Sequence, residues 1–204
     1  MVQSLFVSAG CKMKDEASLI KRIKSGDTEA FSDLVHIYEK RAFNFAYRML
    51  KDAHMAEDAT QEAFLKAYLK INTFMGNSAF QTWFYTILNN VCLDILRKKS
   101  RRPEPLSIEQ KTTDDEEFTL QIEDKSAGPH EALQKKDTNI LLEKAIEKLT
   151  DEHRAVIILR DIEGREYEEI AKILNISLGT VKSRISRARL SLKKILEKEK
   201  ELFF

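Results

Sequence analysis

The chain has 204 residues, of which 34 are Lys or Arg and 33 are Asp or Glu, so its formal net charge is only +1. A protein that coats DNA by bulk charge would be strongly basic, and this near balance excludes that class. Hydrophobic residues make up 43% of the chain, enough for a core, whereas six glycines and three prolines are too few for a loop-rich β protein. The composition therefore predicts an all-α fold.

Proline and acidic residues are concentrated in one segment, which divides the chain. All three prolines lie between residues 103 and 137, together with ten acidic and four basic residues and almost no periodic apolar pattern. A structureless loop of that length inside one compact domain would be unusual. We therefore expect two small helical domains joined by a flexible acidic linker: a tail at 1–14, the first domain at 15–102, the linker at 103–137 and the second domain at 138–204.

Apolar residues recur at helical spacing through the first domain. Asp27 is a predicted N-cap, and the helix after it carries Phe31, Leu34, Val35 and Tyr38 on one face. We expect a further, separate helix over 43–50 and longer helices over 56–71 and 80–96, the last followed by the basic run 97–102.

The second domain carries the same periodicity in shorter pieces. The sequence predicts a helix over 141–149, a helix capped by Thr150 and ending near Gly164, a short helix over 167–174, and a tight turn at 175–177 with Ser177 as the next N-cap. The last helix has apolar residues at a regular 3-4-3-4-3 spacing. These residues are Leu178, Val181, Ile185, Ala188, Leu192 and Ile195.

A short helix, a three-residue turn and a longer basic helix together predict a DNA-binding helix-turn-helix. Between residues 178 and 196 there are six basic residues and no acidic one. A charge run alone would favour an ordinary solvated helix face, but its combination with the turn and the apolar stripe favours DNA. The outward face near the start of the helix carries residue types that reach phosphates and base edges. They are Thr180, Lys182, Ser183, Ser186 and Arg187.

A second candidate site lies on the helix expected over 56–71. Glu57, Asp58, Gln61, Glu62 and Leu65 share the face opposite its alanine stripe. The set could be a solvated face, a group of metal ligands, or a docking surface for a basic partner in which Leu65 supplies an apolar contact. The absence of a suitably spaced His and of a second acidic cluster counts against metal. Spacing alone favours the solvated face.

A third candidate site combines aromatic and polar residues. Five aromatic residues fall within 12 positions, from Phe74 to Tyr85, after the polar segment 72–78. Rings of this kind usually form core, and the residues alone favour that reading. A polar loop flanked by aromatics and followed by basic residues also suits single-stranded nucleic acid, because bases stack on rings.

Five motifs, in order and on both sides of the linker, resemble the bacterial sigma factors of the extracytoplasmic-function (ECF) class, over about residues 15–102 and 138–197. One helix-turn-helix would be a weak signal, whereas the ordered set is specific. The motifs are DATQEAFLKAY at 58–68, FMGNSAFQTW at 74–83 with Asn89 and Asn90, LTDEHR at 149–154, YEEIA at 167–171, and GTVKSR at 179–184.

The resemblance implies a role for each candidate site. It implies that core RNA polymerase, through the clamp coiled coil, binds Asp58, Gln61, Glu62 and Leu65. It implies that the melted −10 promoter strand binds Asn72, Thr73, Phe74, Met75, Gly76, Asn77, Ser78, Phe80 and Asn90. It implies that the −35 element binds Thr180, Lys182, Ser183, Arg184, Ser186 and Arg187.

Two departures from the family pattern limit what the resemblance implies about promoter sequence. Ser186 stands where some relatives carry an aromatic residue, and Asn175 stands where many helix-turn-helix turns have Gly. The −35 sequence that this chain recognises therefore does not follow from a relative.

The resemblance also implies the partners: core RNA polymerase, through its clamp and flap, promoter DNA, and an anti-sigma factor. It implies a cytoplasmic protein without membrane insertion, monomeric when free or 1:1 with the anti-sigma factor. We expect no enzyme, cofactor or metal, since the chain has no phosphate-binding loop, dinucleotide turn or nucleophile–base pair. Two rival classes are a free-standing repressor, for which no sensor domain is visible, and a nuclease using Asp58 and Glu62 with a metal.

Overall fold

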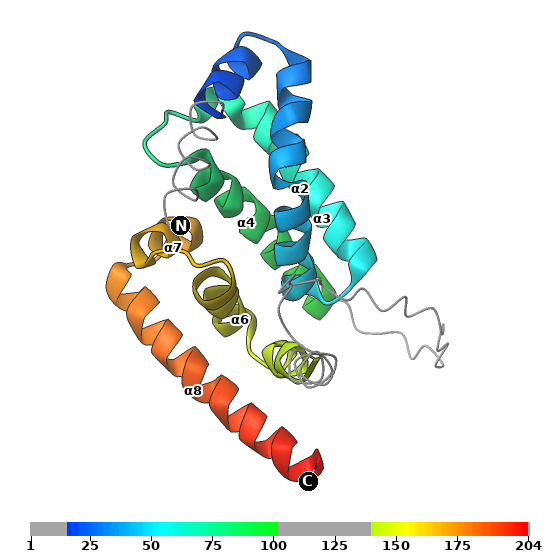
Figure 1. Ribbon diagram of the computed structural model, residues 1–204, viewed down its shortest axis with the longest axis vertical. Helices are drawn as coiled ribbons and strands as arrows, with labels where there is room; N and C mark the ends of the chain where they lie inside the picture. The colour runs from blue at the N-terminus through cyan, green and yellow to red at the C-terminus, as the bar shows by residue number, and fades with distance from the viewer. Residues whose placement is uncertain (1–15, 102–139, 204) are drawn as a thin grey trace, which may run out of the picture.

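The computed structural model describes residues 16–101 and 140–203, and all regular structure within these two ranges is helical (Figure 1). The predicted all-α fold is therefore confirmed, while the expected tail at 1–14 and linker at 103–137 lie outside the described residues. The helical segments are residues 16–24, α2 (Thr28–Leu50), α3 (Ala53–Lys70), the 3-10 turn η1 (Ile71–Thr73), α4 (Phe80–Arg101), residues 140–147, α6 (Asp151–Ile157), the π-helical segment η2 (Ile158–Ile162), α7 (Tyr167–Leu174) and α8 (Leu178–Phe203).

Helix α2 begins at the predicted cap, where the Asp27 carboxylate accepts a hydrogen bond of 3.1 Å from the Ala30 amide. It then runs unbroken for 23 residues until Lys51 takes a left-handed conformation at φ 60°. The expectation of a separate helix over 43–50 is therefore wrong. Residues 39–42 are Glu, Lys, Arg and Ala, which are strong helix formers, and the buried Ala42 carries the core face across the polar stretch.

Helices α2, α3 and α4 pack on one another around an aromatic cluster. The Phe64 ring of α3 stacks on the Phe84 ring of α4 with 4.6 Å between centroids, and Phe31 of α2 meets the Tyr68 ring edge-on at 4.9 Å. Small alanines line the facing side of α3, so the helices approach closely. The predicted stripe of α3 is thus buried, which leaves its opposite side for contacts with other molecules.

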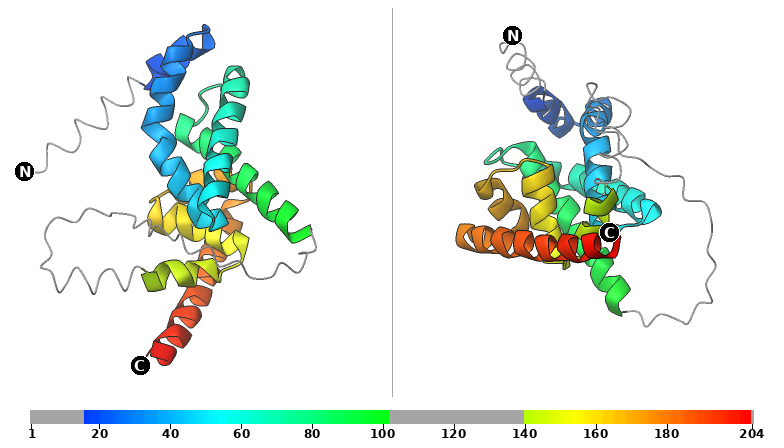
Figure 2. Two further views of the ribbon diagram at one scale, coloured as in Figure 1. Left: turned by 90° about the vertical axis from the view of Figure 1, so that its right-hand side faces the viewer. Right: turned by 60° about the horizontal axis from the view of Figure 1, so that its bottom comes forward.

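The second part of the chain has the predicted helix-turn-helix geometry (Figure 2). Asn175 ends α7 in a left-handed conformation at φ 52°, and the Ser177 hydroxyl accepts a hydrogen bond of 3.1 Å from the Thr180 amide to begin α8. Val181, Ile185 and Ala188 are buried along one face of α8, as their spacing predicted. The opposite face is consequently fixed outward.

The two parts contact each other directly, and their buried side chains form one continuous core. Helix α7 lies against α4 in Figures 1 and 2. Tyr85 of α4 is fully buried because residues of the second part cover it: its hydroxyl donates to the Glu163 carboxylate at 3.2 Å, and the Arg165 guanidinium stacks 5.0 Å from its ring centroid. In the part of the chain that the structure describes, no helix is both long and apolar enough to cross a bilayer.

Candidate functional site

The first candidate surface is the outer side of α3. Asp58 and Glu62 lie there with side chains 66% and 49% exposed. One turn away along the helix, Lys66 pairs with Glu62 at 2.7 Å and the His54 imidazole lies 3.4 Å from the Asp58 carboxylate. Leu65 is 59% exposed, and Leu69, which sequence reasoning missed, is 71% exposed. Positions 58, 62, 65 and 69 follow a 4-3-4 spacing that could have identified Leu69. The outer side of α3 therefore presents two exposed leucines next to two carboxylates. Such a surface suits a partner that offers basic side chains together with apolar ones.

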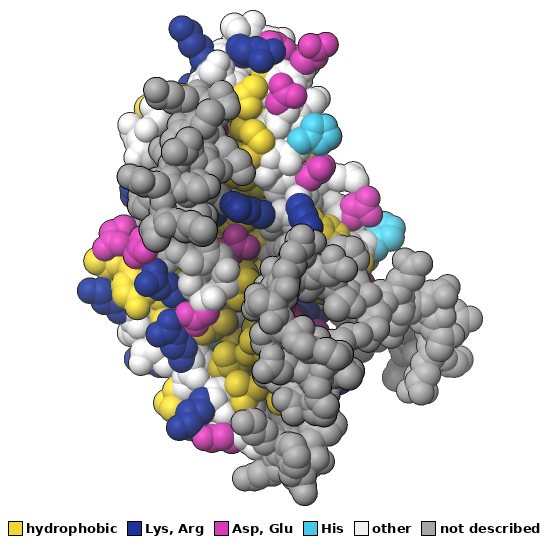
Figure 3. Space-filling model, in the orientation of Figure 1, with side chains coloured by type: hydrophobic (Ala, Val, Ile, Leu, Met, Phe, Trp, Pro, Cys, Tyr) yellow, Lys and Arg dark blue, Asp and Glu magenta, His cyan; other side chains and the backbone are white. Residues whose placement is uncertain are grey.

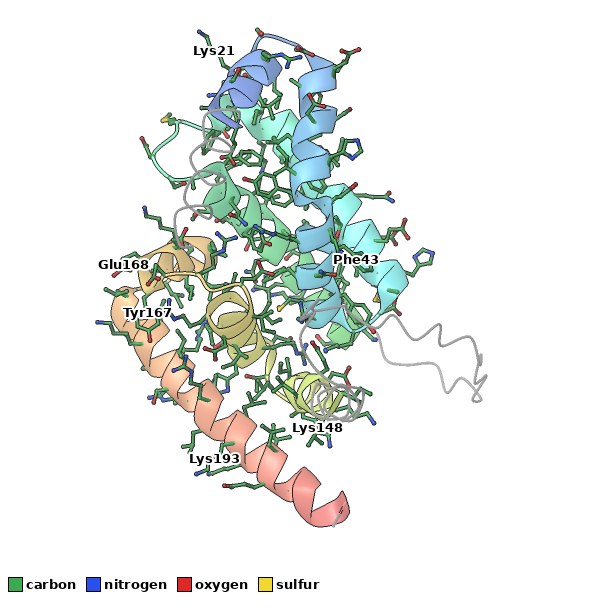
Figure 4. The ribbon with its side chains drawn as sticks, viewed as in Figure 1. Lys21, Phe43, Lys148, Tyr167, Glu168 and Lys193 are labelled. Carbon is green, nitrogen blue, oxygen red and sulfur yellow. The ribbon has the colours of Figure 1, made fainter. Side chains whose placement is uncertain are left out.

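A hollow of about 400 Å³ lies beside this surface, between α2 and α3. Its apolar lining includes Val35, Phe43 and Phe64, and Figure 4 shows Phe43 on α2 facing α3. Gln61, which is also exposed on the outer side of α3, lines it as well. The hollow therefore adjoins the outer side of α3, and its apolar lining could accept an apolar side chain of a partner. Its other lining residues are Glu39, Lys40, Glu57 and Thr60.

Residues 72–78, called the −10 loop below because they hold most of the residues expected to bind the −10 strand, rest on aromatic rings. Phe74 is only 7% exposed and packs 5.8 Å from Phe80 and 5.4 Å from Trp83, measured between ring centroids. The Lys24 ammonium donates to the Phe74 backbone carbonyl and lies 5.9 Å from its ring. Sequence reasoning missed Lys24, because it is 50 positions away and no local pattern joins it to the loop.

The loop's polar side chains and Met75 face solvent above that base. Met75 is 81% exposed, and Gly76 takes φ 75°, a conformation that favours glycine and bends the loop outward. Phe80 is 1% exposed, so it and Phe74 support the loop from below and do not offer their ring faces to a base. The remaining candidates are exposed or half-buried: Asn72, Thr73, Asn77, Ser78 and, on α4, Asn90.

The third candidate surface is the start of α8. Lys182, Ser183, Ser186 and Arg187 are exposed together, whereas Thr180 is half-buried at the cap. Arg184 is turned aside: its guanidinium pairs with Glu152 of α6 at 2.8 Å, which ties α8 to that helix. Among the described residues, no carboxylate forms an ion pair with Lys182 or Arg187, and both side chains are exposed. Figure 3 shows Lys and Arg side chains gathered along the side where α7 and α8 lie.

The side chains with the largest pKa changes lie in the core and not on these three surfaces. Burial raises the pKa of the Cys92 thiol to about 12, and it raises the pKa values of the Tyr38 and Tyr85 hydroxyls above their usual range. Among residues 16–101 and 140–203, no three His, Cys, Asp or Glu side chains are grouped so that they could hold a metal ion. The three surfaces carry groups suited to binding other molecules. The outer side of α3 has carboxylates and leucines, residues 72–78 form a polar loop, and the start of α8 has exposed Lys and Arg side chains.

Comparison with known families agrees with this arrangement. Residues 34–102 match the family model described as Sigma-70 region 2, and residues 140–192 match Sigma-70, region 4. The ECF RNA polymerase sigma factor SigW of Bacillus subtilis is 40% identical over 178 residues, which cover 87% of this chain and 94% of the relative. The ECF RNA polymerase sigma-E factor of Escherichia coli K12 is 34% identical over 84% of this chain and 88% of its own.

Two solved structures with the same fold are complexes of two proteins. CnrH in complex with the cytosolic domain of CnrY has a TM-score of 0.64 at 22% identity, covering 90% of this chain and 98% of that chain. The sigma factor RpoE of Bartonella quintana, in complex with the anti-sigma factor NepR, has a TM-score of 0.59 at 27% identity, covering 82% and 96%. The two matched regions and the relatives together show that this chain belongs to the ECF sigma factors of bacterial RNA polymerase, which direct the polymerase to promoters.

Proposed function

We propose that the three surfaces divide the work of a sigma factor among them. The acidic face of α3 (Asp58, Gln61, Glu62 and Leu65) docks on the clamp coiled coil of core polymerase. The −10 loop binds the melted promoter strand, and the start of α8 reads the −35 element as duplex. The observation that supports this division is that all three surfaces are exposed while each is fixed from behind by buried residues.

Docking through α3 is supported by the chemistry of its face. The Asp58 and Glu62 carboxylates make exposed contacts with His54 and Lys66 of the same helix, and exposed contacts of this kind are weak. A partner's arginines can replace them at little cost and form stronger bidentate contacts with the carboxylates. Apolar contacts add to these charged ones. They come from Leu65, Leu69 and the neighbouring hollow.

Binding of the −10 strand is supported by the construction of the loop. A base flipped out of the duplex loses a few kcal/mol of stacking free energy. Contacts with the −10 loop must compensate for that loss. Met75 and the exposed amides of Asn72 and Asn77 offer an apolar contact and edge-reading groups. Phe74 and Phe80, buried below, hold the loop in one shape before DNA arrives, so less ordering cost falls on binding.

Reading of the −35 element is supported by the exposed side chains at the start of α8. An α-helix fits the major groove, and Arg187 and Lys182 are the cations free to reach guanine or phosphate there. Arg184, held by Glu152, contributes by fixing the angle of α8 against α6. Thr180 and Ser183 lie near the helix start, where amides and hydroxyls commonly contact phosphates.

The partners follow from this role. Because the similar solved structure of RpoE holds a sigma factor with the anti-sigma factor NepR, we infer that an anti-sigma factor binds this chain 1:1 and that the free chain is monomeric. The second domain makes the additional contact with the polymerase flap. The chemistry of RNA synthesis belongs to the polymerase, so this chain acts without catalysis, cofactor or metal, in the cytoplasm where promoter DNA lies.

Co-purification with core polymerase tests the docking surface. The double variant Asp58→Lys/Glu62→Lys should reduce bound core at least tenfold. A matched control is Glu29→Lys/Asp33→Lys, which makes the same charge change on α2. Those positions lie two residues on either side of Phe31, which faces α3, so they point about 160° away from it. Equal recovery of core with both double variants would contradict docking through α3.

A further inference from the structure

Two of the cations on α8 are held by carboxylates of the segments that precede the helix-turn-helix. The Arg184 guanidinium pairs with Glu152, in the first turn of α6, at 2.8 Å. The Arg189 guanidinium donates twice to Asp161 of η2, and the bond from its Nε is 3.2 Å long. Both acids lie outside α8, and α6 packs directly against that helix (Figure 1). Each pair therefore depends on tertiary packing, which leaves no local pattern in the sequence.

The two arginines stand one at each edge of the outward side of α8. They are five residues apart, which places them about 140° apart around the helix. The buried residues of the helix fall within that arc, and the exposed side chains assigned to the −35 element occupy the rest of the circumference. The buried residues are Val181, Ile185 and Ala188. Arg184 and Arg189 thus border the outward face on opposite sides.

These edges are where a helix in the major groove meets the DNA backbone. The groove is about 12 Å wide and has a phosphate backbone along each side. An arginine binds a phosphate through two parallel hydrogen bonds, and such a contact strengthens binding without reading the sequence. Free guanidiniums at positions 184 and 189 would therefore add affinity for DNA of every sequence.

The two carboxylates oppose such contacts. The Glu152 side chain is 68% exposed and that of Arg184 is 21% exposed, so a phosphate that approaches this guanidinium also meets a like charge. In the second pair, the carboxylate side chain is 34% exposed and the arginine side chain 52% exposed. By contrast, Lys182 and Arg187 are exposed, and neither forms an ion pair with any described residue. The acids thus separate two arginines held at the edges from two cations available on the outward face.

We propose that Glu152 and Asp161 are specificity-determining positioning residues: they hold the two edge arginines away from phosphates and so keep the affinity for DNA of unrelated sequence low. This inference rests on the proposed function, which assigns the start of α8 to the −35 element. A promoter competes with a very large number of other sites, so recognition depends on the ratio of specific to non-specific affinity. With the edge arginines held, that ratio is set by the residues that reach base edges. Arg184, for which the resemblance implied a −35 contact, then acts only through its pair with Glu152.

Binding of the full chain to a fluorescein-labelled duplex that contains no promoter tests the role of Glu152. Fluorescence anisotropy is measured over a range of salt concentrations. Glu152→Gln releases Arg184 to a phosphate, so binding at low salt should be about fivefold tighter, and the plot of log affinity against log salt should be steeper by about 0.9. Glu152→Gln combined with Arg184→Gln should return both quantities to the parent values. A substitution that merely loosened α8 would weaken binding and would not steepen the plot.

A second variant and a matched control accompany this measurement. Asp161→Asn should have the same effect as Glu152→Gln, through Arg189. Glu29→Gln removes the same charge from an exposed residue in the first turn of α2, and it should change neither the affinity nor the salt dependence. In transcription with core polymerase, Glu152→Gln should raise the yield from a template with a mutated −35 element about threefold relative to the wild-type template.

The outcomes separate this proposal from the −35 assignment. Duplex affinity and salt dependence of folded Glu152→Gln equal to those of the parent chain would overturn the role of the carboxylate, because that measurement needs neither promoter nor polymerase. Tighter binding that persists after Arg184→Gln is added would overturn the holding of Arg184. A parent chain that transcribes both templates equally would instead overturn the −35 assignment, and the role in specificity with it, whatever the duplex affinity.

Discussion

The guanidinium of Arg154 donates a hydrogen bond of 2.8 Å to the backbone carbonyl of Met49, a residue 105 positions earlier in the sequence. The same side chain donates to the carbonyls of Ile146, Glu147 and Leu149 at 3.3, 2.7 and 3.0 Å. One buried cation therefore satisfies carbonyls at the end of α2 and in the segment leading into α6. It organises residues 140–203 and also connects them to the end of α2.

Arg154→Ala should destabilise the chain by about 3 kcal/mol or more, because several buried carbonyls would lose their donor at once. Unfolding by urea, followed by circular dichroism at 222 nm, measures the change. Lys194→Ala, a loss of one exposed cation on α8, should stay within about 0.5 kcal/mol of the parent. An unfolding midpoint for Arg154→Ala equal to that of the control would refute the organising role.

Lys24→Met should impair promoter melting several-fold without weakening core binding, since Lys24 holds the Phe74 carbonyl beneath the −10 loop. Permanganate reactivity of unpaired thymines in the polymerase complex reports the melted fraction. Lys21→Met removes an equal charge from an exposed position one turn earlier (Figure 4) and serves as the control. If the Lys24→Met variant melted the promoter as well as the Lys21→Met control, the −10 loop would not depend on the hydrogen bond from Lys24 to the Phe74 carbonyl.

Arg187→Ala should weaken −35-dependent transcription by about 1–3 kcal/mol if its guanidinium reads a guanine. The measurement compares transcript yield from a wild-type template and from one with a mutated −35 element. The substitution should matter on the first template and little on the second. An equal loss on both templates would assign Arg187 to the phosphate backbone instead of a base.

The Cys92 thiol should react slowly with iodoacetamide in a folded Cys11→Ser chain, because the side chain is buried and its pKa is raised to about 12. Only the unfolded chain ionises this thiol near its ordinary pKa of about 9, so folding stability should fall as pH rises from about 9 to 12. Mass spectrometry follows the alkylation. A folded chain that is alkylated at pH 8 as fast as the denatured chain would contradict the burial.

Local signals in the sequence were sufficient for the helix ends and the inward faces. Asp27, Thr150 and Ser177 cap helices as predicted, since a cap depends on residues three positions away. The break expected near residue 43 was wrong because only the exposed side of α2 loses its apolar pattern there.

Long-range contacts were what the sequence could not predict. The covering of Tyr85 comes from residues about 80 positions later, and the Arg184–Glu152 pair crosses between helices, so neither leaves a periodic trace. Local patterns in the sequence picked out the three candidate surfaces, and the resemblance assigned a role to each. The support of residues 72–78 by Lys24 and the continuous core shared by the two parts of the chain could be seen only in the coordinates.

Reconstituted transcription tests the central claim most directly. Core polymerase with this chain is given a library of genomic fragments from the source organism, and transcript starts are mapped. The account predicts discrete starts that share one −35 and one −10 sequence, absent with core alone and lost with Asp58→Lys/Glu62→Lys. Starts no different from those of core polymerase alone would contradict it.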